Sequence, residues 1–242
     1  MKAYKATGLL LPLVFAAFLV SAESRVVNLQ AVDGINLKAS YTSPGRQGPG
    51  MLLIHQCNMD RSSWSGISND LVASGIHVLA LDLRGFGESG GEGLAAGFPN
   101  LLQKSAGDAD LAFDYLVSQS GVDASRIGVG GASCGGMITA DLAARRANTV
   151  RVLMLLSSPP GSNAIQNVAE NAKLAVFAAA TNQDPITRGV AVTLEAMVKG
   201  SLNPNSVVRV FDGTEHGLPM FSSNPNLRTE LLNWLKEQLL RE

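Results

Sequence analysis

The sequence predicts an α/β fold with a mostly parallel central sheet, helices on both faces and an N-terminal antiparallel hairpin. Short apolar runs alternate with longer segments of helical periodicity along the chain, a pattern typical of parallel strands joined by crossover helices. The central runs lack polar alternation, as expected for strands covered on both faces. Near the start, two strand-like runs flank Asp33-Gly34, which is a strong hairpin signal.

The expected strands are short runs, each bounded by turn-forming or polar residues. They cover, in chain order, residues 26–32, 35–43, 50–56, 76–83, 126–131, 150–159, 173–181 and 206–213. Between them, residues 60–75 read as a helix ended by Gly75. Residues 101–121 carry apolar side chains at helical spacing, including Leu111 and Tyr115. The remaining expected helices cover residues 135–146, 164–170, 186–199 and 226–242.

Length and charge narrow the class of protein. A chain of 242 residues with a net charge of −1 predicts one domain with a sizeable core. A near-neutral balance offers no electrostatic footprint for nucleic acid and no attraction to an anionic membrane surface. The expected partner is therefore a small molecule, and the composition gives no indication of oligomeric state.

The N-terminal segment has the features of a secretory signal peptide. Lys2 and Lys5 precede an apolar run at residues 9–20, and small residues end at Ala22. We expect a signal peptide over residues 1–22, cleaved after Ala22. The alternative, an uncleaved membrane anchor, is disfavoured because spanning a bilayer takes about 20 apolar residues.

Cleavage would leave residues 23–242 as a single domain that is secreted or periplasmic and has no membrane partner. Such a compartment permits disulfides. Cys57 and Cys134 are the two cysteines of the sequence, so one intrachain bridge is the maximum.

A candidate nucleophile follows the strand at residues 126–131. Residues 131–135 read Gly-Ala-Ser-Cys-Gly and fit the G-x-S-x-G pattern, in which a tight turn from strand to helix exposes the serine hydroxyl. A phosphate-binding loop would end in Gly-Lys-Ser/Thr, and no lysine follows here. A dinucleotide fingerprint would need a third glycine where Ser133 stands.

A serine nucleophile needs a base and a group that orients the base. His216 follows the last expected strand, and Asp184 follows the strand before it. His77 lies within a strand and His55 precedes the serine in the chain, so neither fits the role of the base as well as His216 does. Asp184 could instead cap a helix, and Asp212 competes as the acid, although it lies on the same loop as His216. For the oxyanion, we expect backbone N–H donors at Cys134 and Cys57.

In the order Ser133, Asp184, His216, these motifs resemble the α/β-hydrolase superfamily over nearly all of residues 23–242. Within it the chain looks most like small esterases, dienelactone-hydrolase-like proteins and the serine aminopeptidase-like group. The segments that carry the resemblance are LLIHQCNMDRSSW, ALDLRGFGESGG, GASCGG, TNQDP and GTEHG. Gln56 departs from the usual glycine, and we expect it to narrow the site or to contact substrate.

The resemblance implies an α/β-hydrolase fold without a large lid, because only residues 159–173 separate two strands where a lid is usually inserted. Dienelactone hydrolases use a cysteine nucleophile, but Ala132 stands where a G-x-C-x-G motif around Cys134 would need glycine. We therefore expect Ser133 to be the nucleophile. Cys57 and Cys134, on the two sides of the oxyanion hole, are either bridged or free buried thiols.

The expected function is that of a serine hydrolase that cleaves carboxylic esters of small to medium size through an acyl-enzyme, with no metal or organic cofactor. Two alternatives stay open. One is a peptidase or amidase of the serine aminopeptidase-like type. The other is a non-catalytic binding protein with the α/β-hydrolase fold, since a fold alone does not prove function.

Overall fold

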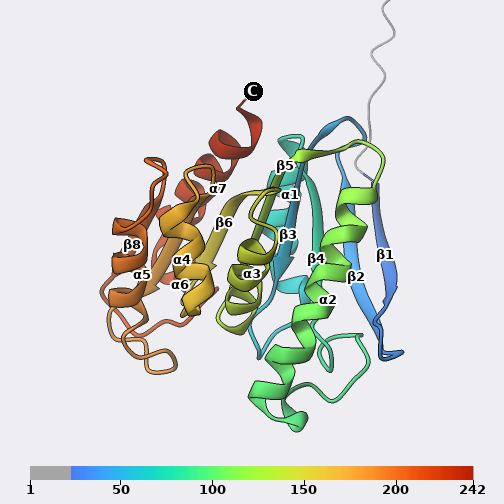
Figure 1. The fold of residues 1–242 in the computed structure, drawn as a ribbon, viewed down its shortest axis with the longest axis horizontal. Helices are drawn as coiled ribbons and strands as arrows, with labels where there is room; N and C mark the ends of the chain where they lie inside the picture. Colours follow the sequence, from blue (N-terminus) through green and yellow to red (C-terminus); the bar gives the residue numbers. More distant parts are fainter. Residues whose placement is uncertain (1–22, 242) are drawn as a thin grey trace, which may run out of the picture.

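A computed structural model describes residues 23–241, which form an eight-stranded sheet in the order β1-β2-β4-β3-β5-β6-β7-β8 (Figure 1). The predicted signal peptide at residues 1–22 lies outside the described residues. The strands are β1 Glu23–Gln30, β2 Asn36–Ser43, β3 Gly48–Ile54, β4 His77–Leu81, β5 Val122–Ala132, β6 Val150–Leu156, β7 Ala175–Thr181 and β8 Val207–Phe211. Strands β3 to β8 pair in parallel, which confirms the predicted architecture.

The antiparallel part of the sheet lies at its N-terminal edge. β1 pairs with β2 from Glu23↔Ser43 to Gln30↔Asn36, and β2 continues antiparallel onto β4. Gly34 turns the hairpin with a φ of 83°, a conformation that glycine adopts without the steric cost of a Cβ. The hairpin predicted from Asp33-Gly34 is thus present.

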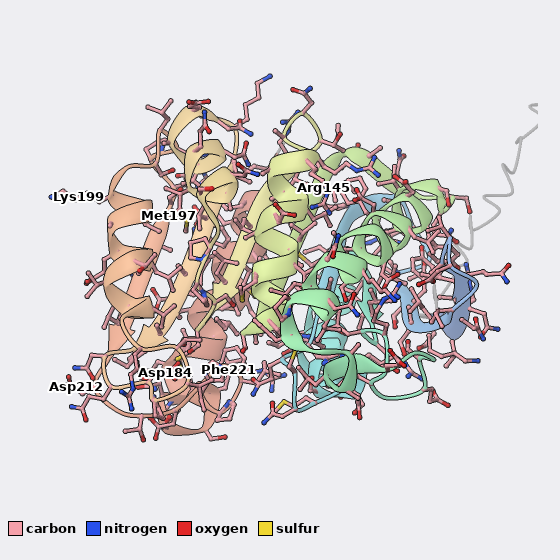
Figure 2. All side chains as sticks on the ribbon, turned by 60° about the horizontal axis from the view of Figure 1, so that its bottom comes forward. Arg145, Asp184, Met197, Lys199, Asp212 and Phe221 are labelled. Carbon is pink, nitrogen blue, oxygen red and sulfur yellow. A yellow bond between two sulfur atoms is a disulfide. The ribbon has the colours of Figure 1, made fainter. Side chains whose placement is uncertain are left out.

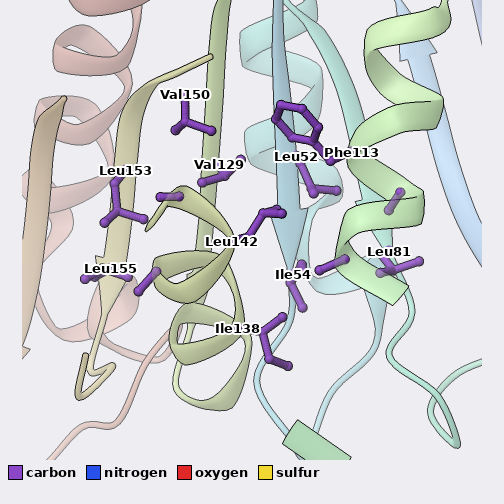
Figure 3. Close-up of a cluster of buried hydrophobic side chains, with 14 of the residues drawn as sticks. Leu52, Ile54, Leu81, Phe113, Val129, Ile138, Leu142, Val150, Leu153 and Leu155 are labelled. Carbon is purple, nitrogen blue, oxygen red and sulfur yellow. The ribbon is translucent and has the colours of Figure 1, made fainter. Parts of the chain in front are cut away.

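Helices cover both faces of the sheet (Figure 1). The helices are α1 Ser65–Ala73, α2 Phe98–Ser118, α3 Cys134–Arg145, α4 Ser162–Glu170, α5 Val190–Lys199, α6 Met220–Ser223 and α7 Pro225–Leu240, with 3-10 turns η1 Arg61–Trp64 and η2 Gly93–Ala96. One core packs α2, α3, α4 and α5 against the sheet, and Figure 3 shows part of it. The second core packs α1, α6 and α7 against the opposite face. No helix within residues 23–241 is long and apolar enough to cross a membrane.

The last helix shows how the sequence pattern sets the packing. Leu227, Leu231, Leu235 and Leu239 recur every fourth position of α7, and all four are buried. Residues at this spacing share one helix face, so α7 turns that face to the sheet and its polar residues to solvent.

Two connections bear on the site. The segment between β6 and β7 contains only α4, so within the described chain no larger insertion stands at the position where a lid was considered. The helix expected over residues 186–199 starts later, at Val190. The preceding residues form a turn because Asp184 Oδ1 accepts hydrogen bonds from the N–H groups of Ile186 and Thr187.

The chain order changes direction at β3, which lies between β4 and β5. The connection from β3 to β4 contains α1 and the connection from β4 to β5 contains α2, and these two helices pack on opposite faces of the sheet. Ligands of open α/β sheets bind at such a switch point. The loops after β3 and β5 carry Cys57 and Ser133.

Candidate active site

Ser133 occupies a sharp turn between β5 and α3. Its backbone has φ 51° and ψ −124°, a region that residues other than glycine rarely adopt and that is typically retained at functional sites. The Ser133 N–H donates to the Leu156 carbonyl at 2.8 Å, which ties the turn to the end of β6. The residue is partly exposed, so the turn leaves the hydroxyl accessible at the carboxyl end of β5.

Two glycines of the G-x-S-x-G pattern are required by close backbone contacts. A Cβ on Gly135 would lie 2.4 Å from the carbonyl oxygens of Ile54 and His55. A Cβ on Gly131 would lie 2.5 Å from the carbonyl carbon of Gly135. These glycines therefore allow the start of α3 to pack directly on β5 and on the end of β3.

Asp184 and His216 are joined by a hydrogen bond. Nδ1 of His216 lies 2.7 Å from Oδ2 of Asp184, and the side chains are 14% and 1% exposed respectively. The hydroxyl of Thr187 also donates to Oδ2, at 2.8 Å. Because Nδ1 faces the carboxylate, Nε2 of His216 is the nitrogen left for proton transfer.

The surroundings of Asp184 keep it ionised. Burial alone would raise the pKa of this carboxyl group, but hydrogen bonds from His216, from the Thr187 hydroxyl and from two backbone N–H groups outweigh burial and lower the pKa below its ordinary value. Asp184 is therefore a carboxylate at neutral pH, as a group that orients an imidazole must be.

The other candidates for the base have different partners. His55 is buried, its Nε2 accepts from the Leu83 N–H at 3.0 Å, and its Nδ1 donates to the Gln56 carbonyl at 2.8 Å. His77 is also buried, between the Tyr41 hydroxyl and the Arg46 carbonyl. Both nitrogens of each ring are thus occupied, and His216 remains as the candidate base.

The two candidate acids, Asp184 and Asp212, also differ in their hydrogen-bond partners. Figure 2 shows Asp184 and Asp212 at one end of the molecule, with Arg145 and Lys199 at the other. Asp212 is exposed and accepts a hydrogen bond from Asn182 at 2.7 Å. Of the two, Asp184 contacts the imidazole. It does not cap a helix, because α5 has Gly189 at its N-cap, but it accepts from the N–H groups of the turn that follows it.

The loop that carries His216 lies against the serine turn. Gly217, the next residue, approaches Ala132, the residue before Ser133, so closely that a Cβ on Gly217 would lie 3.5 Å from the Ala132 Cβ. The Gly217 N–H donates to the Ser157 hydroxyl at 3.0 Å, and the Glu215 carbonyl accepts from Thr181 at 2.8 Å. These bonds hold His216 beside the turn that carries Ser133.

Cys57 and Cys134 form a disulfide, with Cα atoms 5.9 Å apart. This settles the alternative left open by the sequence in favour of the bridge. Among the hydrogen bonds of residues 23–241, none has the N–H of Cys57 or Cys134 as its donor. The bridge therefore holds two candidate oxyanion donors close together, at the start of α3 and in the loop after β3.

Gln56 makes hydrogen bonds within the protein that the sequence did not indicate. Its side chain is buried, its Oε1 accepts from the Leu218 N–H at 2.9 Å, and its Nε2 donates to Asn58 at 2.8 Å. Both ends of the amide are thus hydrogen-bonded within the protein. The sequence did not indicate the bond to Leu218, which is 162 residues away. The substrate contact expected for Gln56 stays a prediction.

Sequence reasoning missed the side chains that support the candidate triad. Thr187 follows Asp184 by one turn, and this spacing is a usable signal for a hydroxyl that bonds an acid. Ser157 and Thr181 stand at the ends of β6 and β7, but serine and threonine are common there. Ser157 has a φ of 49°, a strain that no sequence pattern indicates.

Comparison with known proteins finds a matching family and a shared fold. Residues 50–217 match the family model described as serine aminopeptidase, S33. That range includes the loop after β3, the serine turn, Asp184 and His216.

Individual relatives cover the chain to different extents. A multifunctional-autoprocessing repeats-in-toxin protein of Vibrio cholerae is 46% identical over 79 residues, which are 33% of this chain and 2% of the toxin. The chain thus spans a small fraction of that relative's length. An esterase of Pyrococcus furiosus superposes with a TM-score of 0.70 and 17% identity, over 91% of this chain and 94% of the esterase. A dienelactone hydrolase of Anabaena variabilis gives 0.69 and 17%, over 90% and 96%. At these identities the likeness establishes the fold.

Proposed function

Because the chain belongs to the serine aminopeptidase, S33 family and has the α/β-hydrolase fold, we propose that it is a serine hydrolase acting on carboxylic esters of small to medium size. The observation that carries this proposal is the partly buried Asp184–His216 hydrogen bond beside the strained turn of Ser133. An ionised acid oriented on an imidazole beside an accessible serine is the arrangement of a base and a nucleophile, which favours an enzyme over a non-catalytic binding protein.

In the proposed reaction Ser133 attacks the acyl carbon of the ester. Nε2 of His216 takes the proton from the serine hydroxyl and then gives it to the leaving alcohol. Asp184 accepts the hydrogen bond from Nδ1, which fixes the tautomer and stabilises the imidazolium that forms. The products of this half-reaction are the free alcohol and an acyl-enzyme on Ser133.

The negative charge that develops on the carbonyl oxygen would be bound by the N–H groups of Cys57 and Cys134. Donors fixed before the reaction need no reorganisation, and removing one such donor typically costs about 100- to 1,000-fold in kcat. Water, activated by His216, then attacks the acyl-enzyme and releases the acid. The proposed steps need no metal or organic cofactor.

The proposed substrate size follows from the connection between β6 and β7. That connection holds only the short helix α4, so within the described chain this connection places nothing larger over the candidate site. The esterase and the dienelactone hydrolase that share the fold support an ester substrate. The family description favours a second candidate, a peptidase or amidase.

We also propose that the protein is secreted or periplasmic, with the signal peptide removed after Ala22. The Cys57–Cys134 disulfide supports this, because structural disulfides persist mainly outside the reducing cytosol. Mass spectrometry of the exported protein should find Glu23 at the N-terminus and both cysteines oxidised. A mature chain that retains residues 1–22 would contradict the proposal.

A fluorophosphonate probe and a substrate panel test the catalytic proposal together. The probe should label Ser133 of the folded protein, and Ser133→Ala should abolish both the label and the hydrolysis of p-nitrophenyl esters. Faster turnover of aminoacyl anilides than of esters would favour the peptidase. An unlabelled Ser133 in folded protein would refute the serine hydrolase.

A further inference from the structure

Resting on the proposed function, we propose that Gln56 is a positioning residue that couples the catalytic base to the oxyanion hole. Gln56 belongs to the oxyanion loop, residues 55–59, which follows β3. Its side chain binds the histidine loop, residues 212–219, which follows β8. The hydrogen bond between the two loops joins the Gln56 side chain to the backbone N–H of Leu218, two residues after His216.

Gln56 is itself held rigidly. It is 2% exposed, and its carbonyl oxygen accepts from both the His55 ring at 2.8 Å and the Met59 N–H at 3.0 Å. On the side chain, Nε2 donates to Asn58 at 2.8 Å. This bond fixes the rotation of the amide, so that Oε1 is the atom that faces the histidine loop.

The histidine loop is shaped to receive that oxygen. Oε1 accepts from the Leu218 N–H at 2.9 Å. Gly217 has a φ of 70°, and a Cβ at that position would lie 2.3 Å from Oε1. A glycine next to His216 is therefore required both by the backbone conformation and by the close approach of Gln56.

The other anchors of the histidine loop come from a different part of the sheet. Thr181 at the end of β7 holds the Glu215 carbonyl, and Ser157 after β6 holds the Gly217 N–H. These two bonds tie the histidine loop to the ends of β6 and β7. Gln56 adds a link to the oxyanion loop after β3, which carries the proposed oxyanion donor Cys57.

The neighbouring disulfide completes the coupling. Cys57 is bonded to Cys134, which directly follows Ser133. The chain from His216 through Leu218, Gln56 and Cys57 to the serine turn is thus continuous. An error of about 1 Å in the placement of a reacting group can cost about 100-fold in rate, so this link has a kinetic consequence distinct from stability.

Two substitutions separate the hydrogen bond from the volume of the side chain. Gln56→Met keeps the length and removes the acceptor for the Leu218 N–H. Gln56→Glu keeps an acceptor, and the exposed Asn58 can turn its NH2 group toward the carboxylate. Asn171→Ala is the matched control, because the Asn171 side chain also makes one donor and one acceptor bond, to Ala147 and Lys173. Asn171 precedes β7, at the opposite end of that strand from Asp184.

The measurements are the rate of fluorophosphonate labelling of Ser133, kcat and KM for p-nitrophenyl acetate, and the thermal midpoint of each variant. We expect Gln56→Met to lower the labelling rate and kcat by about 10- to 100-fold with little change in KM. Gln56→Glu should label faster than Gln56→Met. Asn171→Ala should lower the thermal midpoint and leave the labelling rate at the wild-type value.

The outcomes distinguish this inference from the function on which it rests. If wild-type Ser133 is not labelled, the serine hydrolase itself is refuted. If the wild type is labelled and folded Gln56→Met is labelled equally fast, only the positioning role is refuted. Equal rates for Gln56→Glu and Gln56→Met would also overturn it, because the Leu218 bond would then have no effect.

Discussion

The carboxylate of Asp184 divides its two oxygens between two tasks. Oδ1 accepts from the backbone of Ile186 and Thr187, and Oδ2 accepts from Thr187 and His216. The first set fixes the rotation of the side chain, so that the second oxygen is aimed at the imidazole. The effect of a substitution here should therefore depend on charge and acceptor geometry more than on packing.

We predict that Asp184→Asn lowers kcat for p-nitrophenyl acetate by roughly 10³- to 10⁴-fold. An asparagine of the same shape can donate to Nδ1 and so favour the wrong tautomer of His216. The comparison is Asp212→Asn, which changes the exposed carboxylate bonded to Asn182. That variant should retain wild-type kcat. Equal losses of kcat in the two variants would show that the effect is not specific to the carboxylate that contacts His216.

For individual residues, the sequence predicted which residue types form the candidate site, but not their hydrogen-bond partners. Ser133, Asp184 and His216 could be chosen because each follows a strand and their order is typical of one superfamily. The contact between Gln56 and Leu218 joins residues 162 positions apart, and neither residue type marks a site. Such contacts arise from the three-dimensional path of the loops, which one sequence does not specify.

At the scale of elements, the approach of α3 to β3 depends on the small size of Gly135. We predict that Gly135→Ala destabilises the fold by about 1–3 kcal/mol, because its Cβ would overlap the Ile54 and His55 carbonyls. Gly107→Ala, in the exposed middle of α2, meets nothing within 4 Å. This substitution should raise the free energy of unfolding by about 0.5–1 kcal/mol, because alanine has a higher helix propensity than glycine. Urea unfolding of both variants measures the difference, and a Gly135→Ala midpoint at or above that of wild type would contradict it.

The disulfide joins the same two elements covalently. We predict that Cys57→Ala/Cys134→Ala lowers the free energy of unfolding by about 2–4 kcal/mol, since the bridge closes a loop of 77 residues in the unfolded chain. It should also slow the labelling of Ser133, because the two proposed oxyanion donors are no longer linked. A phosphine reductant should shift the wild type in the same direction and leave the double variant unchanged. An equal response of both proteins would rule out the bridge as its cause.

The boundaries of elements were less predictable than their existence. The helix expected from residue 186 begins at Val190 because the carboxylate of Asp184 binds the intervening N–H groups in a turn. Asp184 before Pro185 does resemble a helix cap in sequence. The sequence does not show that the carboxylate also accepts a hydrogen bond from His216, 32 residues further along the chain.

For the molecule as a whole, the sheet and its two layers of helices followed from periodicity alone. Parallel strands such as β7 are buried along their entire length, and their apolar runs are therefore continuous in the sequence. The polar interactions that join the layers leave no such periodic trace. Arg84 is the clearest case, since it lies in the loop after β4 and contacts both the hairpin and α2.

Arg84 forms two hydrogen bonds of 2.6 Å with Asp108 in α2, and another of 2.8 Å with Asp33 in the hairpin turn. Its side chain is 7% exposed and that of Asp108 is 1% exposed.

We predict that Arg84→Met lowers the free energy of unfolding by about 3–5 kcal/mol, because it leaves Asp108 buried without a counter-charge. Arg84→Met/Asp108→Leu should recover most of that loss, since an apolar pair of similar volume replaces a buried ion pair at little net cost. Arg228→Met, which removes an exposed pair with Asp70, should change stability by less than about 1 kcal/mol. Urea midpoints of the three variants decide the matter, and a double variant no more stable than Arg84→Met would mean that the arginine acts through packing rather than through its charge.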